Sequence, residues 1–161
     1  MSMGKRLSVL ALVVLSLGAA RAASPAEISA FVVGASPGET WGTGYGGMLT
    51  ITLFNIVGGE IEGAWQGGSV ADTSIVSAAA KAYIGPSIGR LVPYVGLGAG
   101  AYRESLPTKT DSGTNGLLFA GVKLKFPFGL VVRGEYQWVH MPSDVSAPLD
   151  NRYFFAAGLS F

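Results

Sequence analysis

The sequence predicts an all-β protein, namely an eight-stranded antiparallel up-and-down transmembrane β-barrel. Eight stretches alternate between apolar and polar residues with a period of two, which is typical of strands. Most are about twice as long as the ~5–6 residues usual in soluble proteins and suit the ~9–11 residues of a tilted membrane-crossing strand. The composition agrees, because 49% of the 161 residues are hydrophobic and only 13% are charged.

The N-terminal segment has the pattern of a secretory signal peptide. The basic pair Lys5-Arg6 precedes an apolar run over 7–18, and small residues end at Ala22. An uncleaved membrane anchor is the alternative, but a spanning helix needs about 20 apolar residues and this run is shorter. We therefore expect a cleaved signal peptide over 1–22 and a single barrel domain over 23–161.

The overall composition excludes several classes of function. The chain has no cysteine, which excludes a disulfide framework, a thiolate metal site and a cysteine nucleophile. Its formal net charge is +1, so no polybasic surface favours nucleic acid. The sequence contains no phosphate-binding loop, zinc-protease motif or calcium-loop motif. We expect no cofactor and no metal.

The first four predicted strands, over 27–35, 43–54, 59–68 and 74–85, each place apolar residues at alternate positions. The first is the least regular of the four. Because alternate side chains of a strand point to opposite faces, these residues form one apolar face. Its members are Ile28, Ala30 and Val32, then Tyr45, Leu49, Ile51 and Leu53, then Ile61 and Trp65, then Val76, Ala78, Ala80, Ala82 and Ile84.

The last four predicted strands, over 91–103, 116–126, 130–140 and 151–161, follow the same rule more strictly. Gly96, Gly98 and Gly100 alternate within 91–103, where they leave space for bulky neighbours. The apolar face comprises Val95, Leu97, Ala99 and Ala101, then Leu118, Ala120, Val122, Leu124 and Phe126, then Leu130, Val132, Tyr136 and Trp138, then Tyr153, Phe155, Ala157, Leu159 and Phe161.

The connections between strands alternate in length, which is typical of outer-membrane barrels with short periplasmic turns and longer external loops. Short turns follow the second, fourth and sixth strands. The longer connections, over 36–42, 69–73, 104–115 and 141–150, are expected to face the cell exterior, and 104–115 is predicted to be the longest.

Charged residues lie in mid-strand, opposite the apolar face. In a soluble barrel they would coat the exterior, whereas in a membrane barrel they would fill the lumen. Aromatic residues near both strand ends favour the membrane alternative. The lumen of eight strands is just wide enough for side chains, so we expect a structural ion-pair network rather than an open pore; a gated ion path is the alternative. The predicted members are Glu60, Glu62, Lys81, Lys123, Lys125, Arg133 and Glu135.

Glu135 is predicted to pair with Lys123 or Arg133. A three-residue turn with Gly129 in the left-handed region would bring Lys123 opposite Arg133 and diagonal to Glu135. We expect Glu60 and Glu62 to lie beside Lys81 on the neighbouring strand.

The single histidine is the one candidate for catalysis. His140 is followed by Ser143 and Asp144, but a hydrolase needs its nucleophile and base within hydrogen-bond reach, and nothing else supports a triad. A solvated histidine beside Trp138 is the favoured interpretation. We predict no catalytic residue and no enzymatic activity.

Four segments carry a resemblance to a known family: 93–102 (PYVGLGAGAY), 121–128, 132–138 (VRGEYQW) and the ending 157–161 (AGLSF). With the signal peptide, they resemble the small outer-membrane β-barrel domain family of the OmpA/OmpX type. The resemblance implies an eight-stranded barrel in the bacterial outer membrane, in contact with lipid and lipopolysaccharide. It also implies that Phe161 is the signal read by the barrel-assembly machinery. Because the chain stops at Phe161, we expect no periplasmic domain.

The sequence therefore predicts a monomeric outer-membrane barrel with a structural or surface-interaction role. The main alternative is a soluble periplasmic ligand-binding β-barrel, which would expose the charged face. A lipid A-modifying barrel enzyme and a narrow solute channel are the others.

Overall fold

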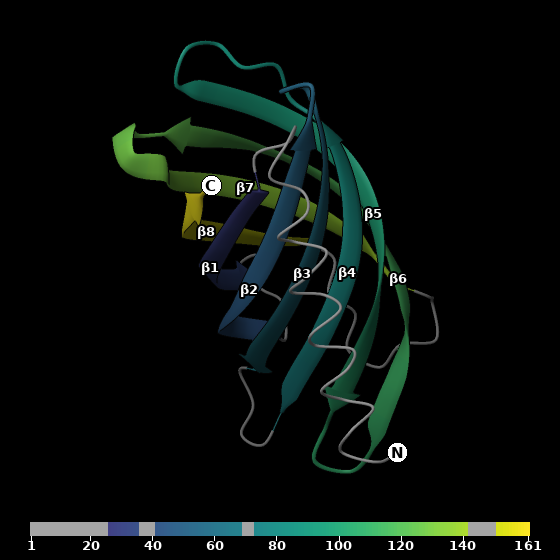
Figure 1. The fold of residues 1–161 in the computed structure, drawn as a ribbon. Helices are drawn as coiled ribbons and strands as arrows, with labels where there is room; N and C mark the ends of the chain where they lie inside the picture. The colour runs from purple at the N-terminus through teal and green to yellow at the C-terminus, as the bar shows by residue number, and fades with distance from the viewer. Residues whose placement is uncertain (1–25, 36–40, 69–72, 142–150) are drawn as a thin grey trace, which may run out of the picture.

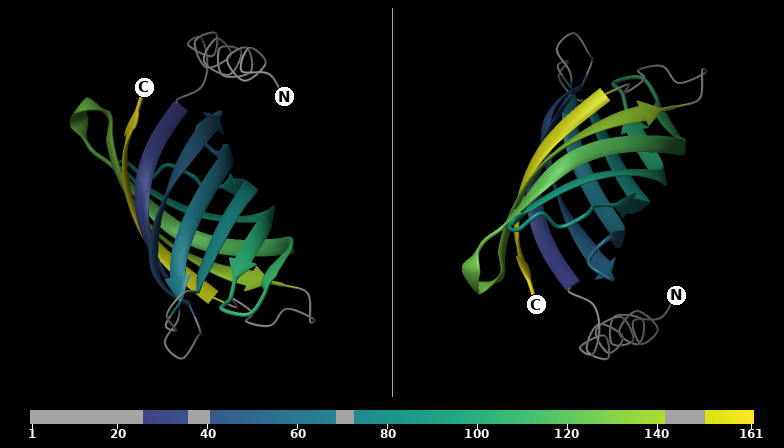
Figure 2. Two further views of the ribbon diagram at one scale, coloured as in Figure 1. Left: turned by 90° about the horizontal axis from the view of Figure 1, so that it is seen from below. Right: turned by 90° about the horizontal axis from the view of Figure 1, so that it is seen from above.

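The chain forms a closed barrel of eight antiparallel strands, as predicted (Figure 1). The computed structural model describes residues 26–35, 41–68, 73–141 and 151–161, so the predicted signal peptide lies outside the described residues. Each strand pairs with the next, and β8 pairs with β1 to close the wall, which Figure 2 shows from two sides. The strands are β1 (Ala26–Ala35), β2 (Trp41–Leu53), β3 (Val57–Gly68), β4 (Ser74–Ile84), β5 (Leu91–Ser105), β6 (Thr110–Lys125), β7 (Leu130–His140) and β8 (Asn151–Ser160).

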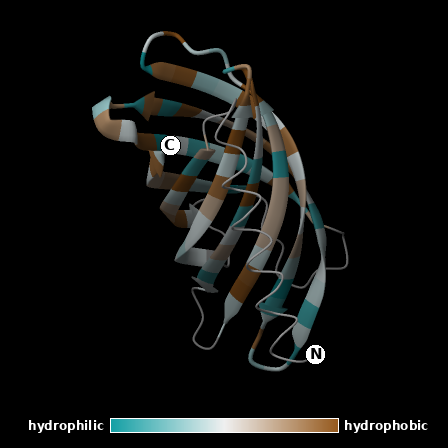
Figure 3. Ribbon diagram, in the orientation of Figure 1, coloured by the Kyte–Doolittle hydropathy of each residue, from teal (hydrophilic) through white to brown (hydrophobic). Residues whose placement is uncertain are grey.

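The two faces of the wall differ in polarity, and the predicted apolar face points outward. Ile61, Leu97 and Phe155 are 66%, 67% and 64% exposed, whereas the residues between them in sequence are turned into the barrel. Figure 3 shows the resulting alternation of hydropathy along the strands. Within the eight described strands, Arg103 is the one charged side chain that is exposed on the outer face. No helix among the described residues is both long and apolar enough to span a bilayer.

One end of the barrel, here called the turn end, carries the three short connections. Phe54 and Asn55 both have positive φ, 53° and 57°, as the central residues of a type I′ turn require, and the Ile56 N–H donates to the Leu53 carbonyl at 3.1 Å. Between β6 and β7, the short 3-10 turn η2 (Pro127–Gly129) has positive φ at Phe128 and at Gly129. The Phe126 N–H donates to the Leu130 carbonyl at 2.7 Å, which sets the predicted register of Lys123 opposite Arg133.

The opposite end, the loop end, departs from the prediction. The expected long loop over 104–115 is wrong, because the β5–β6 ladder continues to the pair Ser105 and Thr110. The hairpin extends past the end of β7, whose last pair joins His140 to Gly116 (Figure 1). Residues 110–115 are polar or glycine on both faces, so they carry no apolar alternation, and the Asp-Ser-Gly sequence within them is typical of turns. The other three predicted loops lie largely outside the described residues.

The core of the protein is the inside of the barrel. Glycines on the inner face make room for large side chains, since a Cβ at Gly58 would collide with the Tyr83 ring and one at Gly96 with Phe119. An apolar cluster fills the lumen near the loop end, and charged residues fill its middle. The cluster comprises Ala35, Ile75, Ala79, Tyr102, Leu117, Val139 and Met141, with Leu106 packed against it.

Candidate functional site

Eight charged side chains meet inside the barrel, and we call them the lumen network. Four are acidic and four are basic, so their formal charges cancel, and none is more than 4% exposed. They come from β1, β3, β4, β6, β7 and β8, because period-two alternation turns one residue in two of each strand inward. The members are Glu27, Glu60, Glu62, Glu135, Lys81, Lys123, Arg133 and Arg152.

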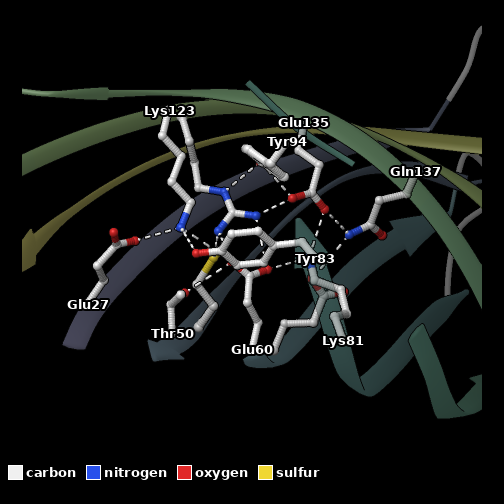
Figure 4. Close-up of polar contacts among 12 residues, drawn as sticks. Glu27, Thr50, Glu60, Lys81, Tyr83, Tyr94, Lys123, Glu135 and Gln137 are labelled. Atoms are coloured by element: carbon white, nitrogen blue, oxygen red, sulfur yellow. Dashed lines mark hydrogen bonds and ion pairs between the residues drawn. The ribbon is translucent and has the colours of Figure 1, made fainter. Parts of the chain in front are cut away.

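Glu60 lies at the centre of the lumen network (Figure 4). The two terminal nitrogens of Arg133 approach its two carboxylate oxygens, at 2.5 and 3.1 Å. Lys81 Nζ lies 3.0 Å from Oε2, and the Thr50 hydroxyl donates to Oε1 at 3.1 Å. The forked guanidinium suits a carboxylate held at two points, so Glu60 and Arg133 join β3 to β7 across the barrel.

Glu135 is the second acceptor in the centre. Lys81 Nζ donates to Oε1 at 2.7 Å, and the Tyr94 hydroxyl donates to Oε2 at 2.8 Å. Gln137 Nε2 donates to Oε1 at 2.6 Å, and Arg133 contacts Oε2. Arg133 is one of the two partners predicted for Glu135, but its other cation is Lys81 from across the lumen rather than Lys123.

Two arms extend the lumen network toward the ends of the barrel. Toward the loop end, Glu62 contacts Arg152 and lies 2.9 Å from Lys81 Nζ. Toward the turn end, Lys123 Nζ lies 2.9 Å from Glu27 and donates to the Tyr83 hydroxyl at 3.0 Å. Every carboxylate of the lumen network therefore has a cation within contact distance.

Aromatic rings lie beside the buried cations. Lys81 Nζ lies 4.4 Å from the centroid of Phe119, and the Arg133 guanidinium carbon lies 5.0 Å from that of Tyr94. A cation over a ring face is attracted by about 0.5–2 kcal/mol, most when it is desolvated. These contacts stabilise cations that are almost fully buried.

Six of the seven predicted network residues meet in the lumen. The exception is Lys125, which is half-buried near the turn end and forms no ion pair within the described part of the chain. The prediction did not include Glu27 or Arg152, which stand second in the first and last strands. They were overlooked because they stand near strand ends, although Arg152 points inward like Phe154, two residues later in the same strand.

The remaining candidate residues are not part of the lumen network. His140 is exposed at the end of β7, and Ser143 and Asp144 lie outside the described residues. Phe161 is 72% exposed, and its backbone pairs with Ala26 through two hydrogen bonds of 2.9 and 3.1 Å. Among the described residues, no group of three or more histidine or acidic side chains is placed to hold a metal ion.

Comparisons with known proteins identify the fold. No family model matches the sequence, and no curated protein matches it. The N-terminal barrel domain of Pseudomonas aeruginosa OprF aligns over 85% of this chain and 97% of that domain, with a TM-score of 0.61 and 17% identity. Neisserial surface protein A aligns over 85% and 94%, with a TM-score of 0.57 and 13% identity.

The Yersinia pestis outer-membrane protein Ail, solved in a phospholipid nanodisc, aligns over 86% of this chain and 99% of its own length. The TM-score is 0.56 at 18% identity. The chain therefore has the eight-stranded fold of these outer-membrane barrels, with a lumen filled by paired charges.

Proposed function

We propose that this protein is an integral barrel of the bacterial outer membrane, with a closed lumen, a structural or surface-interaction role and no enzymatic activity. The observation that carries the proposal is the inverted polarity of the wall: within the described strands the outer face bears one charge, at Arg103, while nine charged side chains are buried inside. In a membrane barrel the apolar face meets lipid and the polar face lines the lumen.

A soluble barrel would need the opposite arrangement. Monomeric soluble proteins rarely expose contiguous apolar patches above a few hundred Å², yet large apolar side chains are exposed on every strand of this barrel. A soluble ligand-binding barrel would instead hold an apolar cavity, whereas the middle of this lumen contains ion pairs. The polarity therefore favours the membrane alternative over the soluble periplasmic one.

The surface role is supported by the fold and by the compared proteins. One of them is named as a surface protein, and another is described as an attachment invasion locus protein. The lumen network occupies the space that a solute would need, which argues against a wide channel.

We also propose a route by which the protein reaches the outer membrane. A signal peptide over 1–22 directs export, and the barrel-assembly machinery reads β8 with its terminal Phe161. The mature barrel is a monomer in contact with lipid and lipopolysaccharide.

Membrane fractionation of cells expressing the full chain tests localisation, and heat-modifiable gel mobility tests for a folded barrel. We expect the protein in the outer-membrane fraction, migrating differently before and after boiling. Recovery as a soluble protein without detergent would refute the proposal and favour the soluble barrel.

Two further assays test the role of the purified barrel. Lipid A incubated with it should keep its acyl chains, and acyl-chain loss that disappears in His140→Ala would identify an enzyme. Planar-bilayer recordings should show no large stable conductance, and such a conductance would identify a channel.

A further inference from the structure

Buried oxygen atoms without partners lie on the inner face of the β5–β6 hairpin, near the loop end. Within the described residues, three buried side-chain polar atoms have no hydrogen-bond partner: both carboxylate oxygens of Glu104 and Oδ1 of Asn115. All three are acceptors. Buried acceptors left unpaired are destabilising, so these atoms lack a donor or a cation.

Glu104 faces a second carboxylate directly across the hairpin. Glu104 and Asp111 are partners in the β5–β6 register, and both point to the inner face. Side chains at directly opposed positions lie about 4.5–5.5 Å apart at Cβ, where like charges destabilise the pair. On its other side Glu104 is paired with Ile75 of β4, which offers no charge.

Lys109, in the same hairpin, lies near this carboxylate pair. Lys109 Nζ lies 2.7 Å from Asp111 Oδ2, but the Lys109 side chain is 47% exposed. Glu104 is fully buried and has no such contact. Burial, together with the facing Asp111, raises the pKa of Glu104 above its usual range, although Lys109 opposes the shift.

The carboxylate pair lies beyond the apolar band of the wall. Arg103, the residue before Glu104, is exposed on the outer face, where a charged side chain within hydrocarbon would be costly. The outer surface therefore leaves the hydrocarbon at about Arg103. The Asp111 side chain is 36% exposed, so ions from outside can reach the pair from its side.

We propose that Glu104 and Asp111 bind a divalent metal ion, with Ca²⁺ as the best match. Ca²⁺ takes six to eight oxygen ligands in flexible geometry, and carboxylates are its preferred protein ligands. Two carboxylates fill only part of the coordination shell of Ca²⁺, and water fills the remaining positions. We therefore expect a weak site with Kd on the order of 10⁻⁴–10⁻³ M, as in extracellular modules. The bound ion joins β5 to β6 where the hairpin extends past β7.

Isothermal titration calorimetry of the purified barrel with CaCl₂ tests the site directly. The full barrel is treated with EDTA, freed of lipopolysaccharide and held in detergent, and heat-modifiable mobility verifies that every variant is folded. We expect one Ca²⁺ per barrel. Glu104→Gln, which keeps the shape of the side chain, should weaken binding at least tenfold, and Asp111→Asn should weaken it as well.

Two basic residues of the same hairpin provide matched controls. Lys109→Ala removes a cation that competes for Asp111, so it should tighten Ca²⁺ binding. Arg103→Ala removes an equal charge from the outer face and should retain binding. No saturable Ca²⁺ heat in the unmodified barrel would overturn the proposal, and so would a folded Glu104→Gln variant that binds as tightly as the unmodified barrel.

Discussion

The lumen network predicts a strong energetic coupling between Lys81 and Glu135. Lys81 Nζ lies within 3.0 Å of three carboxylates, those of Glu60, Glu62 and Glu135. Lys81→Met keeps an unbranched chain of similar length but leaves four acidic residues facing three basic ones. Glu135→Gln leaves the opposite imbalance, and the double variant restores equal numbers.

The magnitudes follow from what each variant leaves unpaired. Removing one partner of a buried ion pair costs about 3–5 kcal/mol, because the other charge stays buried without compensation. In the double variant neither imbalance remains, while Arg133 keeps Glu60 and Arg152 keeps Glu62. We therefore expect the double variant to be more stable than the sum of the two losses predicts, by about 2–3 kcal/mol, near the upper end for residues in contact.

Urea unfolding from phospholipid vesicles, followed by tryptophan fluorescence, measures the four free energies of the cycle. Leu97→Ala, a truncation on the outer face of the wall, serves as a reference outside the lumen network. A coupling below about 0.5 kcal/mol would indicate independent sites. It would refute the reasoning, since it would mean that water solvates the lumen charges separately.

Two further outcomes test the wall and the C-terminus. Leu97→Arg should destabilise the barrel in vesicles by about 2–4 kcal/mol, the range for a basic residue at the bilayer midplane. Phe128→Arg, in the exposed turn, should have little effect. If both variants lowered the free energy of unfolding equally in the same urea assay, the wall would not face lipid. Phe161→Ser should lower the amount of protein assembled in the outer membrane of cells. Refolding in detergent should be unchanged, because Phe161 is 72% exposed and packs little. Normal assembly in cells would exclude Phe161 as the assembly signal.

The sequence was sufficient to predict the fold because one rule holds along the apolar band of the wall. Period-two alternation fixes which face each residue occupies, and even the irregular first strand turns Ile28, Ala30 and Val32 outward. The rule failed for 110–115, where the hairpin leaves the apolar band. There both faces are polar, so a strand and a loop have the same pattern.

The lumen network was only partly predictable for a different reason. The period-two alternation placed Lys81 and Glu135 on the inner face, but the two residues are 54 positions apart in sequence and meet across the lumen. Such contacts depend on the diameter of the barrel and the stagger of its strands, which alternation does not encode. Alternation relates only neighbouring strands, so Arg133 was among the predicted partners of Glu135 but Lys81 was not.

The lumen network also explains how the strands keep their register. A slip of one residue turns every side chain of a strand to the other face. If both faces of β7 were apolar, such a slip would cost little. With Arg133 on the inner face, the slip would move a guanidinium toward lipid at about 2–4 kcal/mol and would leave Glu60 and Glu135 without their shared partner. Buried ion pairs are weak evidence for stability, and fixing register is the use for which buried polar groups are best attested. We therefore infer that the charges of this lumen favour one strand register over the registers shifted by one residue.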